Sequence, residues 1–139
     1  MKIGTLKAAP KTEWKDTELG DIRVLVSGLK TVEFRRKLEM LLTQPAVAKQ
    51  IRSGGKREAE VRDQAFNKSL ADTVLRDWEN LTDDDDKPIP YEHITALQLI
   101  TDSLSFRDAV VSAANEIDQE RYISEEDVLG NSLPTSAGG

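Results

Sequence analysis

Four consecutive carboxylates, Asp83 to Asp86, come nearest to a chemical site in this sequence. Clustered carboxylates can bind Ca²⁺, but an EF-hand loop needs oxygen ligands at alternating positions, a central glycine and a bidentate glutamate at its twelfth position. Lys87 and Pro88 occupy places where ligands or turn residues would be needed. Adjacent carboxylates also repel one another. The sequence therefore predicts a solvated acidic turn, assigns it no metal ligand and leaves weak cation binding open.

His93 is the only histidine and the other candidate for acid–base or metal chemistry. A general base needs a positioned partner, and a metal site needs several ligands. Glu92 is the only neighbour that could serve, and on a helix it would point elsewhere, so a surface or helix-cap histidine is favoured. The sequence also lacks cysteine, a glycine-rich phosphate loop and a serine-centred nucleophile motif. It predicts a protein that is not an enzyme, with no catalytic residue, metal or cofactor.

Length and charge narrow the class of protein further. A chain of 139 residues suits one domain with a modest core. Its net charge of −6 argues against nucleic-acid binding, because phosphate recognition needs a concentrated basic surface. No stretch approaches the roughly 20 apolar residues of a membrane span, and no apolar leader follows Met1. A soluble intracellular protein is expected.

A β-hairpin is the first of the elements that must position these residues. Ile22, Val24 and Val26 alternate with Asp21, Arg23, Leu25 and Ser27, between Gly20 and Gly28, and this β-rich run is typical of a strand. A lone strand cannot satisfy its backbone hydrogen bonds, so Glu13 to Thr17 is the expected partner.

Helical spacing of apolar residues accounts for most of the remaining chain. Thr31 can cap a helix that begins at Val32, and Ser53-Gly54-Gly55 forms the main joint. Ala46 to Ile51 is either another short helix or a kinked continuation of the helix from Val32. The later predicted helices are about Lys56 to Leu81, Tyr91 to Thr101, and one capped by Ser103 or Ser105 that runs through Ile117.

The predicted fold is mainly α with a small N-terminal β element (α+β), in which a β-hairpin precedes a compact bundle of about four to five helices. We expect a flexible arm at residues 1–13, one helical domain including the hairpin at 14–122, and a flexible C-terminal tail at 123–139.

Four large apolar residues are the first candidates for binding a partner: Phe34, Leu38, Phe66 and Trp78. Trp78 falls on the apolar stripe of the long predicted helix, which favours a core position. Phe66 falls off that stripe, so it either widens the buried face or contacts a partner.

Charged residues on the predicted helices have two interpretations. Asp72 and Arg76 have the i,i+4 spacing of an ion pair. The triplet Arg35-Arg36-Lys37 forms either a solvated helix face or a docking patch for an acidic partner.

Residues 74–117 contain a series of short motifs. They are Trp78-Glu79-Asn80-Leu81, the acidic turn Asp83 to Asp86, Lys87 to Tyr91, Ala96 with Leu97 and Leu99, and Phe106 to Val111. In this order the motifs resemble the tail assembly chaperones of long-tailed bacteriophages. That family often has a glycine in the turn where this chain has Asp86, which leaves a left-handed position there open.

The resemblance implies a non-enzymatic factor of phage or prophage tail morphogenesis. Such a protein binds and solubilises the tape-measure protein, helps to recruit subunits of the major tail (tube) protein, and is absent from the mature virion. It would work in the cytoplasm of the bacterial host, without nucleic acid or membrane. A frameshift-extended form of itself and a homo-oligomer stay open as further partners. The alternative function is an acidic protein-binding adaptor or a nucleic-acid-mimic decoy.

Overall fold

A three-stranded antiparallel sheet and five α-helices make up the residues that the computed structural model describes, 11–132, with side chains for 11–121. The sheet has the order β1-β2-β3. Its strands are β1 (Thr12–Asp16), β2 (Arg23–Ser27) and β3 (Leu75–Glu79). The helices are α2 (Val32–Leu42), α3 (Pro45–Ser53), α4 (Gly55–Ser69), α5 (His93–Asp102) and α6 (Leu104–Ser132). The predicted α+β class is confirmed.

The predicted hairpin is present as β1 and β2. The strands pair antiparallel, with Trp14 opposite Leu25. In the turn, the Thr17 hydroxyl donates to the Ile22 carbonyl at 2.7 Å and accepts from the Leu19 amide at 3.2 Å. Gly20 has a φ of +64°, which glycine adopts at little cost.

β3 corrects the prediction of one helix from about Lys56 to Leu81. α4 ends at Ser69, a π-helical turn (η1, Leu70–Val74) follows, and the chain then extends. On β2, Val26 faces Leu75 whereas Leu25 faces Asp77, so the skipped residue forms a β-bulge. The bulge lets Leu75 and Trp78 both reach the core although they are three residues apart.

The capping residues and the glycine joint between helices lie where the sequence predicted them. The Thr31 hydroxyl caps α2 by accepting from the Phe34 amide at 3.1 Å. Ser103 caps α6 in the same way, accepting from the Phe106 amide at 3.2 Å. Gly54 links α3 to α4 with a φ of 69°, a left-handed position that suits glycine.

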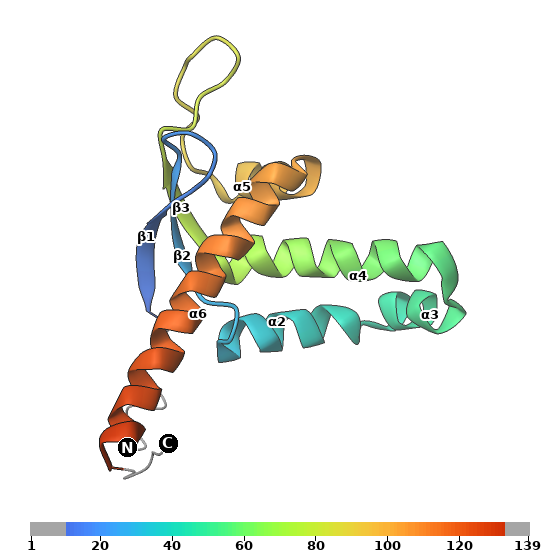
Figure 1. The fold of residues 1–139 in the computed structure, drawn as a ribbon. Coiled ribbons are helices and arrows are strands. Elements are labelled where there is room, and N and C mark those ends of the chain that lie inside the picture. Colours follow the sequence, from blue (N-terminus) through green and yellow to red (C-terminus); the bar gives the residue numbers. More distant parts are fainter. Residues whose placement is uncertain (1–10, 133–139) are drawn as a thin grey trace.

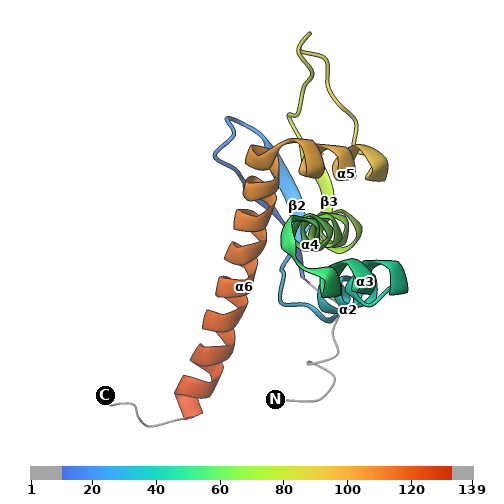
Figure 2. The ribbon, with the colours of Figure 1, turned by 90° about the vertical axis from the view of Figure 1, so that its right-hand side faces the viewer.

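The fold has two parts: the sheet with α6 packed across it, and a helical arm made of α2, α3 and α4 (Figure 1). Figure 1 shows α2 and α4 side by side, running in opposite directions, with α3 joining them at the far end. α6 packs against β2 and β1 and continues past the sheet in both views (Figures 1 and 2). The core lies where the sheet, η1, α5 and α6 meet. Its fully buried residues include Val24, Val26, Leu70, Val74, Ala96, Ile100, Val110 and Ala114.

The predicted boundaries fall partly beyond the described residues. Of the predicted arm at 1–13, residues 1–10 lie outside them, and β1 begins at Thr12. Of the predicted tail at 123–139, residues 133–139 lie outside them, and α6 extends to Ser132. Among the helices that the structure describes, none is both long and apolar enough to cross a membrane.

Candidate partner-binding groove

The acidic turn projects from the body beyond β3 (Figure 1). The Asp83 carboxylate folds it by accepting from the amides of Asp85 and Lys87, at 2.8 and 3.0 Å. Asp86 has a φ of 59°, so the turn keeps its left-handed position with aspartate in place of glycine. The side chains of this turn are exposed, as predicted.

Asp72, on η1, is the centre of an ion-pair cluster. Its carboxylate contacts Lys37 Nζ at 3.1 Å and Lys68 Nζ at 3.6 Å, and it hydrogen-bonds with His93 Nε2. Burial raises the pKa of the Asp72 carboxyl, but hydrogen bonds from Lys37 and His93 and the charge of Lys68 outweigh it, so the net pKa is lowered. The cluster ties α2, α4 and α5 to η1.

This cluster changes two sequence predictions. The i,i+4 pair of Asp72 with Arg76 does not form, because the helix ends before Arg76. His93 is a half-exposed residue at the start of α5, as the surface interpretation predicted, but its partner is Asp72 rather than Glu92. Nothing local in the sequence could reveal that partner, because 21 residues separate them.

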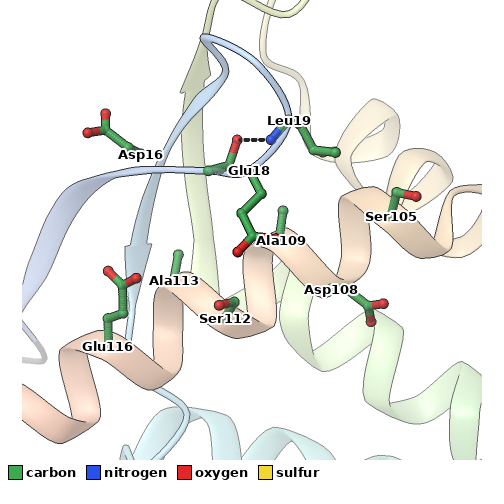
Figure 3. A pocket seen from close by; sticks show the side chains of 10 residues that line it. Asp16, Glu18, Leu19, Ser105, Asp108, Ala109, Ser112, Ala113 and Glu116 are labelled. Atoms are coloured by element: carbon green, nitrogen blue, oxygen red, sulfur yellow. Dashed lines mark hydrogen bonds between the residues drawn. The ribbon is translucent and has the colours of Figure 1, made fainter.

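A hollow of about 640 Å³ lies between the hairpin turn and the first half of α6. Asp16 and Glu18 line it from the hairpin, and Asp108 and Glu116 line it from α6. Figure 3 shows the carboxylates of Asp108 and Glu116 pointing in different directions. Within the described part of the chain, no three His, Cys, Asp or Glu side chains are grouped to hold a metal ion. The hollow therefore presents no metal centre.

The structure brings together three of the four predicted partner-binding residues. The rings of Phe34 and Phe66 meet edge to face between α2 and α4, with centroids 5.6 Å apart. Leu38 lies half-buried one turn after Phe34, and the Arg107 guanidinium covers the Phe66 ring at 4.9 Å. Phe66 thus widens the buried face, one of its two predicted roles.

Trp78 lies apart from these three, in the core. It is 6% exposed, and its Nε1–H donates to the Ile89 carbonyl at 2.7 Å. Its ring packs edge to face against Tyr91 and Phe106, at 4.9 and 6.0 Å. Trp78 holds the acidic turn and α6 to the sheet from within the core.

An open hollow of about 390 Å³ lies along the start of α2; we call it the α2 groove. It is lined by Leu29, Lys30, Thr31, Val32, Phe34, Arg35 and Leu38. Val32, the first residue of α2, is 42% exposed. Beside it, Leu29 and Leu38 are half-buried, so the groove presents a small apolar surface to solvent.

Cations flank the α2 groove in this acidic protein. Lys30 and Arg35 line it, and both are exposed. Among the described residues neither side chain has an ion-pair partner, and the same holds for the adjacent Arg36. Lys37, the last of the predicted basic triplet, instead binds Asp72. The triplet is thus divided between an internal ion pair and a free basic edge.

Asp118 of α6 fixes the near end of the α2 groove. Its carboxylate accepts from the amide of Leu29 at 2.9 Å and from that of Lys30 at 3.2 Å. Gly28 makes this approach possible, because a Cβ there would lie 2.1 Å from an Asp118 carboxylate oxygen. The groove is therefore positioned by a contact between residues 88 and 89 positions apart.

Comparison with known proteins identifies the family. A family model described as YdaY prophage protein matches residues 29–131. This chain belongs to the YdaY prophage protein family. It is thus a prophage protein. This confirms the broader part of the prediction made from the resemblance, that the chain is a phage or prophage protein. No curated protein and no solved structure matches it.

The YdaY match covers the α2 groove and the helices, and it leaves out β1 and β2. It starts at Leu29, the first residue that lines the groove, and ends close to the C-terminus of α6. The groove, the Asp72 cluster and α6 are therefore all parts of the region that matches the YdaY family.

Proposed function

We propose that this YdaY-family protein is a non-enzymatic tail assembly chaperone that binds the prophage tape-measure protein and keeps it soluble. The observation that carries the proposal is the α2 groove, an open apolar hollow with an exposed Val32 between Lys30 and Arg35. A tape-measure protein is long, helical and apolar, and an amphipathic helix can bind by laying its apolar face into such a groove.

The motifs of residues 74–117 support the same function. They resemble tail assembly chaperones, and in this fold they form β3, the acidic turn, α5 and the first half of α6. Trp78, Ile89, Tyr91 and Phe106 pack together there. In this proposal the motifs build the scaffold, and the α2 groove on the helical arm makes the contact with the partner.

The rest of the proposed role follows the family that the motifs resemble. The protein acts in the cytoplasm of the bacterial host, helps to recruit the major tail (tube) protein, and leaves before the virion is complete. The exposed carboxylates of the acidic turn, Asp83 to Asp86, keep the coated tape-measure protein dispersed by mutual repulsion.

Co-expression with the tape-measure protein of the same prophage gene cluster tests this function. We expect the tape-measure protein to become soluble and to co-purify with the wild-type chain. The substitution Val32→Gln removes the exposed apolar contact and should return most of the tape-measure protein to the insoluble fraction.

Met40→Gln is the matched control. Met40 is also exposed on α2, at 48%, but it does not line the α2 groove, so this variant should solubilise the tape-measure protein as well as wild type does. Equal insolubility with and without the wild-type chain would exclude the chaperone function. If both variants lose the same amount of soluble tape-measure protein, the contact does not lie in the groove.

A further inference from the structure

The second half of α6 extends away from the domain. α6 is 29 residues long, roughly 44 Å at 1.5 Å per residue, and Asp118 lies near its middle. In both views its C-terminal turns lie beyond the sheet and beyond the near end of α2 (Figures 1 and 2). We call residues 122–132 the α6 tip.

The sequence of the α6 tip is acidic and partly apolar. It contains Glu125, Glu126 and Asp127 and has no lysine or arginine, so its charge is −3. Tyr122, Ile123, Val128 and Leu129 surround these carboxylates in the sequence.

The α2 groove has the complementary character. Its floor is apolar, through Leu29, Phe34 and Leu38, and its edges are Lys30 and Arg35, which have no ion-pair partner in the described part of the chain. A basic edge and an acidic helix steer each other into contact, and an apolar floor supplies the area to bury.

The groove and the tip of one chain point in different directions. Both start at the contact of Asp118 with Leu29 and Lys30, from which α2 and α6 diverge (Figures 1 and 2). α6 is one continuous helix to Ser132, so its tip reaches the groove of another copy more readily than its own.

We infer that two copies of this protein associate reciprocally, with the α6 tip of each copy bound in the α2 groove of the other. Such an interface is isologous, since the same two surfaces meet twice around a two-fold axis. The inference rests on the groove and the sequence of α6, and not on the identity of the partner in the proposed function. If that function holds as well, the tape-measure protein displaces the tip from the groove.

Charge-swap variants test the association by sedimentation velocity. One variant carries Lys30→Glu and Arg35→Glu, which makes groove and tip both acidic; the other carries Glu125→Lys, Glu126→Lys and Asp127→Lys, which makes both basic. We expect wild type to dimerise and each variant alone to lose at least tenfold in self-affinity, because like charges then face each other. An equimolar mixture should form heterodimers, since each acidic surface again meets a basic one.

The control variant carries Lys49→Glu and Arg52→Glu, two exposed positions on α3 that do not line the α2 groove. It changes the net charge by the same amount as the groove variant and should dimerise like wild type. Recovery on mixing also shows that both charge-swap variants are folded.

Three results would overturn the inference: a monomeric wild type, charge-swap variants that dimerise alone, or a mixture that stays monomeric. A tip that binds its own groove gives the first result. None of these would affect the co-expression test, so failure of the dimer and failure of the chaperone function are distinguishable.

Discussion

The Asp72 cluster and the α2 groove both include basic residues of α2, but these residues are ion-paired in the cluster and exposed at the groove. On α2, Lys37 points into the cluster and binds Asp72, which also contacts Lys68 and His93. Arg35, two residues earlier, is exposed at the groove. The cluster uses charge to join elements of the fold, whereas the groove leaves its charged side chains exposed.

The apolar residues of the two regions differ in the same sense. Beside the cluster, Leu70 and Val74 are fully buried and Trp78 is nearly so. In the groove, Val32 is 42% exposed. A side chain that is buried within the chain contributes to folding stability, and one that is left exposed can contribute only when something else covers it. Mutations should therefore separate stability from binding.

The largest expected effect on folding stability comes from a substitution in the core, at Trp78. Trp78→Ala should lower the free energy of unfolding by about 3–5 kcal/mol, because it removes two ring contacts and one hydrogen bond and leaves a cavity. Urea unfolding followed by circular dichroism measures the change. A loss no larger than that of an exposed substitution would show that Trp78 does not support the core.

Asp72→Asn should have the next largest effect, about 1–3 kcal/mol, because Lys37 and Lys68 lose their charged partner. The folded pKa of Asp72 lies below its ordinary value, so its contribution is present above the unfolded pKa of about 3.9. That contribution disappears as the pH falls through the folded pKa. Unfolding measured from pH 7 down to pH 3 should show the wild-type and variant stabilities converging at the acid end.

Asp118→Asn tests the link between the groove and the body. It weakens the hydrogen bonds from the Leu29 and Lys30 amides, so we expect a loss of about 1–2 kcal/mol in unfolding free energy. Hydrogen exchange should also show faster exchange of these two amides. Unchanged protection would mean that the groove is held without this carboxylate.

Val32→Gln should have the smallest effect on stability, within about 0.5 kcal/mol of wild type, because the residue is already largely solvated. Its effect on solubilising the tape-measure protein should be large. A variant that unfolds readily would show that Val32 belongs to the core, and the contrast between the two regions would not hold there.

Much of the fold follows from local sequence signals. The strand at Arg23–Ser27, its partner, the Thr31 cap and the Ser103 cap all lie where alternation and capping residues predict them. β3 could not be predicted in this way. Leu75 and Trp78 have helical spacing, and only the bulge opposite β2 lets both face the core from a strand. Pairing between residues some 50 positions apart decided that element.

The candidate site was predictable in part. Phe34 and Leu38 do line the α2 groove, and for the basic triplet next to them the sequence left a solvated face or a docking patch open. The exposure of Val32 was not predictable, because it depends on where α6 and the sheet leave α2 uncovered. The Asp118 contact had no local signal either, since it joins residues almost 90 positions apart.

The position of Asp118 in the chain also sets the order in which the groove is built during translation. A ribosome makes Leu29 and Lys30 long before it makes Asp118, so the N-terminal side of α2 can fold first without its anchor. The groove acquires its final geometry only after 88 further residues have been added and the long loop has closed. Until then the amides of Leu29 and Lys30 lack the carboxylate that they bind in the folded protein.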